Sequence, residues 1–283
     1  MDNTICTYFT HAGNVSPFDR VMASPLPLAR RAEAVARAGF AGMGFGLDDF
    51  NQQATELGVN EINRILRANG LQHTEVEVLL DWFVEGPRRA ASDLRRAQLL
   101  QAAEQLGARH IKVAGDLSGV PQPMSRLVAE FQQLCSEAAA VGTSVTIELF
   151  PSSNLADLQT GFALVDQAGC RNGGLLLDIW HMVRGHIPIQ AIASLPTGVI
   201  NHIELDDGTL LPSSDYFTDT CCSRLPCGEG EFPLAEFMQA VKATGYDGLY
   251  GTEILSASFR SMDVEAAVMR AGESTRYALS LQD

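Results

Sequence analysis

The sequence predicts an α/β fold, a single (β/α)₈ TIM barrel that spans residues 1–283 as one domain. Three observations support this prediction. Eight short apolar segments alternate with amphipathic segments, and a glycine follows most of the amphipathic segments. The segment after the first strand, Thr10–Asn14, lacks the glycine-rich phosphate turn of a doubly wound nucleotide-binding sheet.

The eight apolar segments have the length of strands, and several are rich in Val and Ile. We expect strands at Thr4–Phe9, Phe40–Phe45, His73–Leu80, His110–Ala114, Ser144–Phe150, Gly174–Asp178, Val199–Asp206 and Gly248–Ile254. The helical segments are Leu28–Ala38, Asn51–Asn69, Arg88–Leu106, Met124–Val141, Leu155–Ala168 and Leu234–Thr244, each ending before a glycine. The irregular segment 207–232 follows the seventh strand, and we expect a functional loop there.

Composition narrows the class of protein. The formal net charge is −14, which disfavours binding to nucleic acid or to an anionic membrane surface. No apolar segment approaches the roughly 20 residues that span a bilayer. The chain begins without a secretory signal pattern, and its six cysteines lack zinc-knuckle spacing, so we expect a reduced, cytoplasmic protein.

Four predicted strands carry a carboxylate near their C-terminal ends, where a barrel of this kind places its active site. These residues are Glu148, Asp178, Glu204 and Glu253. An isolated buried carboxylate is costly, so four that converge would call for a cation. For any one of them the alternative is an exposed strand end or a helix cap, and Asp178 is well suited to capping.

These motifs resemble the xylose isomerase-like TIM barrels, a superfamily of sugar isomerases and epimerases that also includes endonuclease IV. The resemblance rests on Ile147-Glu148, on Asp178-x-x-His181, on a strand-seven motif that ends in Asp207, and on Thr252-Glu253. It extends to Ala38-Gly39-Phe40-x-Gly42 and Arg224-x-Pro226-x-Gly228-x-Gly230. By position it implies that Glu148, Asp178 and Glu253 bind a metal and that His181 and Arg224 contact substrate. It also implies that Glu148 and Glu253 move the proton.

Strand seven departs from the family pattern. Alignment on Asp207 places Glu204 where the family usually has a histidine ligand, and His202 lies two residues earlier. The two side chains share one face, about 6.6 Å apart, so only one reaches the ligand layer. We favour Glu204 as the ligand and place His202 beside it, nearer the substrate or one layer deeper. If the register shifts, His202 becomes the ligand.

Oxygen-only ligands favour one Mn²⁺ or Mg²⁺ ion, with Zn²⁺ or Co²⁺ as alternatives. The excess negative charge requires Lys112 or Arg224 nearby, or a glutamate that stays protonated. Lys112 and Glu77 are candidates for the pocket wall, although both could equally be surface residues. Trp180 is a candidate apolar wall for a sugar ring, or an ordinary packing residue.

The resemblance implies an isomerase or epimerase that removes a proton next to the carbonyl of a keto sugar. A metal-dependent dehydratase of a keto-inositol or dehydroshikimate-like substrate is the close alternative. A non-catalytic binding barrel and an endonuclease IV-like enzyme are less favoured, the latter because of the acidic charge. We expect a small carbohydrate as the partner. Barrels of this group often pair, which leaves a homo-oligomer open.

Overall fold

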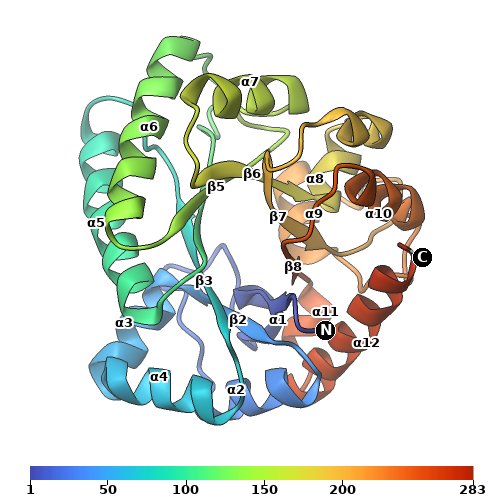
Figure 1. Cartoon of the computed structure of the whole chain (residues 1–283). Coiled ribbons are helices and arrows are strands. Elements are labelled where there is room, and N and C mark those ends of the chain that lie inside the picture. Colours follow the sequence, from blue (N-terminus) through green and yellow to red (C-terminus); the bar gives the residue numbers. More distant parts are fainter. Residues whose placement is uncertain (283) are drawn as a thin grey trace.

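A computed structural model describes residues 1–282 and shows a closed barrel of eight parallel strands in sequence order (Figure 1). Strand β8 pairs with β1 and closes the barrel. The strands are β1 (Thr4–Cys6), β2 (Gly42–Gly46), β3 (His73–Leu79), β4 (His110–Ala114), β5 (Ser144–Glu148), β6 (Gly173–Asp178), β7 (Ile200–Leu205) and β8 (Leu249–Thr252). The predicted fold class is confirmed.

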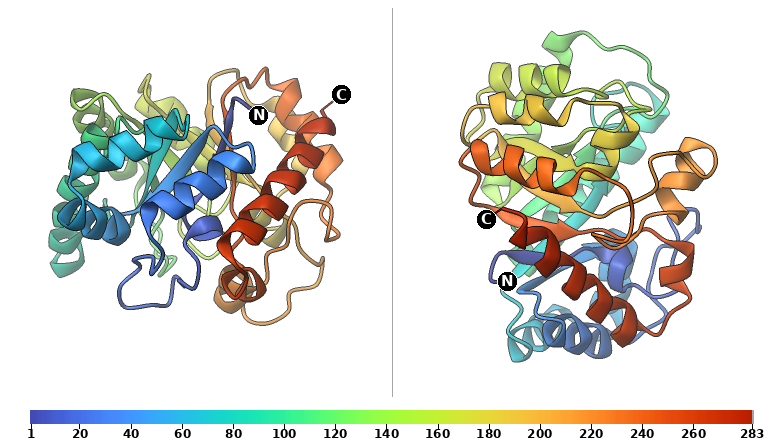
Figure 2. Two further views of the ribbon diagram at one scale, coloured as in Figure 1. Left: turned by 90° about the horizontal axis from the view of Figure 1, so that it is seen from below. Right: turned by 90° about the vertical axis from the view of Figure 1, so that its right-hand side faces the viewer.

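The helices surround the strands (Figure 1). They are α1 (Tyr8–His11), α2 (Leu28–Arg37), α3 (Leu47–Glu56), α4 (Val59–Ala68), α5 (Pro87–Leu106), α6 (Met124–Ala140), α7 (Leu158–Ala168), α8 (Ile179–Arg184), the 3₁₀ helix η1 (Ile189–Ser194), α9 (Tyr216–Cys222), α10 (Leu234–Ala243), α11 (Ala257–Arg260) and α12 (Val264–Ser280). Near the chain ends, α12 packs beside α2 (Figure 2). Within residues 1–282, no helix has both the length and the apolar character needed to cross a membrane.

Two predicted elements were wrong in extent. The helix expected over Asn51–Asn69 is two helices, α3 and α4, because Gly58 adopts a φ of 81° that ordinary side chains disfavour. The first strand ends at Cys6 and not at Phe9, since the following residues turn into α1. The other predicted strands match the observed ones to within about two residues at each end.

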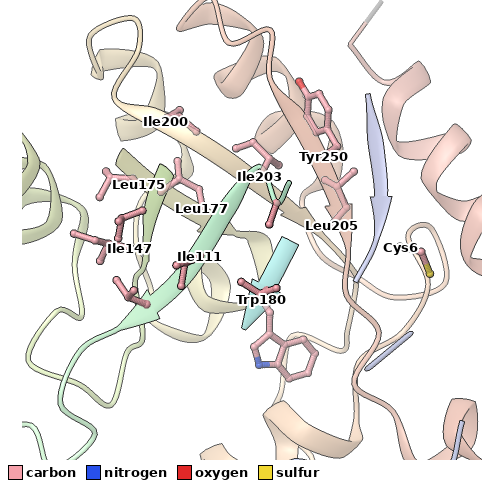
Figure 3. Close-up of a cluster of buried hydrophobic side chains, with 14 of the residues drawn as sticks. Cys6, Ile111, Ile147, Leu175, Leu177, Trp180, Ile200, Ile203, Leu205 and Tyr250 are labelled. Carbon is pink, nitrogen blue, oxygen red and sulfur yellow. The ribbon is translucent and has the colours of Figure 1, made fainter. Parts of the chain in front are cut away.

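One face of each strand forms the apolar layer beneath the helices. Ile111, Ile147, Leu175, Leu177 and Ile203 are among the buried side chains of this layer (Figure 3). They share one continuous cluster with helix residues, which are Phe131 and Leu134 of α6, Leu164 of α7 and Phe237 of α10. This layer alternates with residues that point into the barrel, so the strand periodicity fixes which side chains reach the interior.

The barrel interior is polar. Lys112 of β4 contacts Glu204 of β7, and Glu75 of β3 lies 3.4 Å from His202 of β7. These strands are not neighbours in the barrel, so the contacts cross its interior. On β2 the inward positions are glycines, and a Cβ on Gly44 would lie 2.9 Å from a Glu75 oxygen. The glycines therefore leave room for the charged side chains opposite.

A substitution at Gly42 tests how closely β2 and β3 approach each other. A Cβ on Gly42 would lie 2.3 Å from the carbonyl oxygen of His73, which is its register partner. Gly42→Ala should therefore lower the free energy of unfolding by about 1–3 kcal/mol, as overpacking does. Urea unfolding followed by circular dichroism measures this loss.

The control is Gly70→Ala. Gly70 has a φ of 70° and no atom within 4 Å of an added Cβ, so this variant should lose only about 1 kcal/mol of conformational free energy. Equal losses for the two variants would show that β2 and β3 do not approach as closely as described.

Candidate metal and active site

Four carboxylates meet at the C-terminal ends of the later strands. Glu148 ends β5, Asp178 ends β6, Glu204 lies in β7, and Glu253 directly follows β8. One oxygen of each lies within 4.8 Å of the corresponding oxygens of the others. All four side chains are buried. The structure thus brings together the four residues that the sequence predicts as ligands.

Lys112 supplies the first positive charge to this cluster. Its buried ammonium contacts Glu204 and lies 2.9 Å from Glu77 and 3.7 Å from Glu253. Burial alone favours the neutral amine, but the surrounding carboxylates, Glu204 foremost, raise the pKa of Lys112 well above its ordinary value. The lysine is therefore charged, as the expected charge compensation requires.

Arg224 supplies the second positive charge from the loop after β7. Its Nη1 donates to Asp178 Oδ2 at 2.7 Å and to Asp206 Oδ2 at 2.5 Å, and it lies 3.2 Å from Glu253. The prediction did not include Asp206. The sequence did contain an indication of this residue. Side chains alternate along a strand, so Asp206 lies on the same face as Glu204.

Asp178 caps a helix and also faces the carboxylate cluster. Its Oδ1 accepts a hydrogen bond from the backbone N–H of Trp180 at 2.8 Å and so caps α8. Its Oδ2 turns toward Arg224 and the other carboxylates. Capping and site formation are therefore compatible, because a carboxylate has two oxygens to share.

His181 stands between Glu148 and the long loop. Its Nε2 lies 3.0 Å from Glu148 Oε1, and its Nδ1 lies 2.9 Å from the Tyr216 hydroxyl. If the hydroxyl donates to Nδ1, then Nε2 carries the proton that faces Glu148. Tyr216 belongs to α9 within the predicted functional loop and was not among the predicted site residues.

His202 and Trp180 lie behind the site. His202 is fully buried, and its ring packs at an angle of 48° against the ring of His110, with the ring centroids 4.5 Å apart. This is the deeper of the two positions expected for it. Trp180 is also fully buried, donates from Nε1 to Thr220 at 3.0 Å, and packs on Phe232. Neither residue lines the cavity described next.

A cavity of about 160 Å³ opens onto the carboxylates. Its polar and charged lining residues are Glu77, Arg95, Glu148, Thr220, Arg224 and Glu253. Its wall is largely apolar and includes Tyr8, Phe9, Met22, Leu47, Val78, Leu80, Leu117, Phe150 and Leu255. Of the residues predicted to contact substrate, Arg224 lines this cavity, whereas His181 and Lys112 lie buried beside it.

The electrostatics of the cluster favour a further cation. Burial raises the pKa of Glu253 to about 8 despite Lys112 and Arg224, and burial also raises the pKa values of Glu204 and Asp206 well above their ordinary range. Glu204 Oε2 and Asp206 Oδ1 are buried without a hydrogen-bond partner. A divalent ion would satisfy such oxygens, so the donor set fits a metal.

Comparison with known proteins places this geometry in a family. A family model described as xylose isomerase-like TIM barrel matches residues 32–277, which confirms the resemblance seen in the motifs. A 3-dehydroshikimate dehydratase of Pseudomonas aeruginosa (strain PAO1) is 28% identical over 247 residues, or 84% of this chain. The chain spans only 38% of the length of that relative.

Two solved structures share the fold. An IOLI protein with a bound zinc atom superposes with a TM-score of 0.85 at 15% identity, covering 98% of both chains. A D-psicose 3-epimerase solved in the presence of D-fructose superposes with a TM-score of 0.73 at 16% identity, covering 99% of both chains. At these identities the two structures support the fold alone.

The raised pKa of Glu253 predicts how stability varies with pH in the metal-free protein. The pKa of a glutamate in an unfolded chain is about 4.3, and burial raises the pKa of Glu253 to about 8 in the folded protein. Between these values the folded state holds a proton that the unfolded state has released. The free energy of unfolding should therefore fall as pH rises through this window.

Urea unfolding of chelator-treated protein at several pH values within the window measures the slope. Glu253→Gln is the matched control, because it keeps the shape but cannot titrate. It should make the slope less steep, while Glu204 and Asp206, whose pKa values are also raised, retain the remainder. A wild-type stability that rises with pH across the window would contradict the described environment of Glu253.

Proposed function

The chain belongs to the family of xylose isomerase-like TIM barrels, and on that premise we propose that it is a divalent-metal-dependent dehydratase of a cyclic hydroxyketone. The observation that carries the proposal is the cavity, whose lining is mostly apolar and includes three glutamates and the arginines Arg95 and Arg224. A keto sugar has a hydroxyl on almost every carbon, and an apolar wall would leave several of them without partners. A ring with few hydroxyls and some CH or CH₂ groups suits this wall better.

The sequence relative supports the same choice. The dehydratase from Pseudomonas aeruginosa is named for 3-dehydroshikimate and aligns with most of this chain. A dehydroshikimate-like ring was the alternative substrate expected from the resemblance, and the apolar wall now favours it.

Glu148, Asp178, Glu204 and Glu253 would hold the ion. When bound, a divalent ion would polarise the substrate carbonyl and make the neighbouring C–H more acidic. An all-oxygen donor set favours Mn²⁺ or Mg²⁺. Asp178 and Glu204 do not line the cavity, whereas Glu148 and Glu253 do.

Glu148 and Glu253 therefore carry the proton transfers. One carboxylate accepts the proton from the carbon next to the carbonyl, and the C–H electrons form the new C=C bond as the C–O bond of the β-hydroxyl breaks. The other carboxyl group gives a proton to the departing oxygen, which leaves as water. His181 Nε2 lies 3.0 Å from Glu148 and Arg224 Nη1 lies 3.2 Å from Glu253, so each carboxyl group has a polar neighbour beside it.

Epimerisation or isomerisation of a keto sugar is the second candidate. It is supported by the arrival of two glutamates, Glu148 and Glu253, from different strands at one cavity. One glutamate could remove a proton and the other could return it to the same or an adjacent carbon, with no loss of water.

The test offers 3-dehydroshikimate, D-psicose and D-fructose to the Mn²⁺-loaded protein in D₂O, with analysis by mass spectrometry. We expect loss of water from the cyclic ketone and no deuterium in the recovered sugars. Deuterium in the sugars without loss of water would support the epimerase instead. If no substrate changes with either Mn²⁺ or Mg²⁺ bound, the proposed chemistry fails.

Variants then test the assigned residues. Glu148→Gln and Glu253→Gln should each lower kcat by about 10²–10⁴-fold, the usual contribution of a positioned acid or base. Glu104→Gln changes an exposed glutamate of α5 and should leave kcat unchanged. A full kcat in either cavity variant would remove that residue from the mechanism.

A further inference from the structure

A second cluster of ionisable side chains lies in the barrel interior and plays no part in the proposed reaction. It consists of Glu75 from β3, His110 from β4 and His202 from β7. None of the three is more than 1% exposed, and none lines the cavity. We propose that these residues form a second metal site, which takes a divalent ion of the zinc or iron(II) class.

The distances match those between ligands of a single ion. Glu75 Oε2 lies 3.1 Å from His110 Nε2 and 3.4 Å from His202 Nε2. A tetrahedral zinc ion about 2 Å from each ligand holds its ligand atoms roughly 3.3 Å apart. The two oxygen–nitrogen separations therefore match this geometry, and all three ligand atoms lie within 4.8 Å of one another.

The same atoms lack satisfactory hydrogen bonds. Both Nε2 atoms and both oxygens of Glu75 are buried without a correctly directed partner, although the groups lie close together. Unpaired buried polar atoms are costly and uncommon. A metal ion accepts a lone pair from each of its ligands. We therefore expect the ligands of one ion to lie close together without being aligned for hydrogen bonds to one another. One ion would satisfy all three residues at once.

Lys112 separates this site from the carboxylate site. Its ammonium lies 3.1 Å from Glu75 Oε1, the oxygen that does not face the histidines, and it contacts Glu204 on the other side. His202 and Glu204 share a face of β7 about 6.6 Å apart along the strand. The two ligand atoms are closer than their backbone positions, with His202 Nε2 3.9 Å from Glu204 Oε1. The two sites therefore occupy adjacent layers of the barrel and would hold neighbouring ions, with the Lys112 ammonium beside both.

The charge of the interior also favours a second ion. Seven buried carboxylates face two buried cations, Lys112 and Arg224. The carboxylates are Glu75, Glu77, Glu148, Asp178, Glu204, Asp206 and Glu253. When all seven carboxylates are ionised, the two cations and one divalent ion balance only four of their negative charges. Two imidazoles and one carboxylate favour Zn²⁺ or Fe²⁺ over Mg²⁺. Away from the cavity, this ion would link β3, β4 and β7.

The experiment measures zinc by elemental analysis in the full chain after chelator treatment, reloading with Zn²⁺ and removal of the excess. We expect two zinc ions per chain in the wild type and one in the double variant His110→Asn/His202→Asn. His11→Asn is the matched control, since His11 is a buried histidine outside both sites that bonds to the Gly44 carbonyl. It should retain two.

A second variant keeps the test decisive if the histidine variants fail to fold. Glu148→Gln/Asp178→Asn weakens the carboxylate site, and its remaining zinc should show scattering from two imidazoles in X-ray absorption. His181 beside the carboxylate site could supply one imidazole only. Absence of zinc from this folded variant, or zinc with fewer than two imidazole ligands, would overturn the proposal. A wild type with one zinc bound by two imidazoles would support the second site while contradicting the carboxylate site, so the two failures are distinguishable.

Discussion

The ammonium of Lys112, enclosed by carboxylates from several strands, is the interaction on which the polar interior depends. It contacts Glu204 and lies near Glu75, Glu77 and Glu253, and so joins β3, β4, β7 and the end of β8. Removing one partner from a buried charge cluster typically costs about 3–5 kcal/mol, far more than an exposed pair contributes. An apolar residue at position 112 would leave these carboxylates without a shared counter-charge. The lysine is therefore what allows several carboxylates to be buried together in the barrel.

The long loop after β7 supplies the positive charge at the rim of the barrel. Its Arg224 bridges Asp178 and Asp206, and its Tyr216 fixes the orientation of His181. Asp207 holds the loop in place by accepting hydrogen bonds from the backbone N–H groups of Gly228 and Phe232, both at 2.9 Å. The residues that complete the site thus come from a segment whose own backbone is anchored at the end of β7.

Much of this arrangement could be predicted from the sequence because strand ends are local features. Glu148, Asp178, Glu204 and Glu253 each close an apolar segment, and parallel strands of a barrel bring such ends together. The alternation along β7 also placed His202 below Glu204. Contacts across the barrel could not be predicted in this way, because they depend on the tilt and stagger of strands distant in sequence. Glu75 and His110 therefore gave no usable signal, and neither did the pairing of Tyr216 with His181.

The proposed function requires a divalent ion among the four strand-end carboxylates, with Lys112 and Arg224 beside it. The most direct measurement is a crystal structure of the Mn²⁺-loaded protein with an anomalous difference map. We expect an anomalous peak about 2.2 Å from one oxygen each of Glu148, Asp178, Glu204 and Glu253, a distance typical of a metal bound by oxygen ligands. A map without a peak among these four residues, with the Lys112 ammonium as their only central cation, would contradict it.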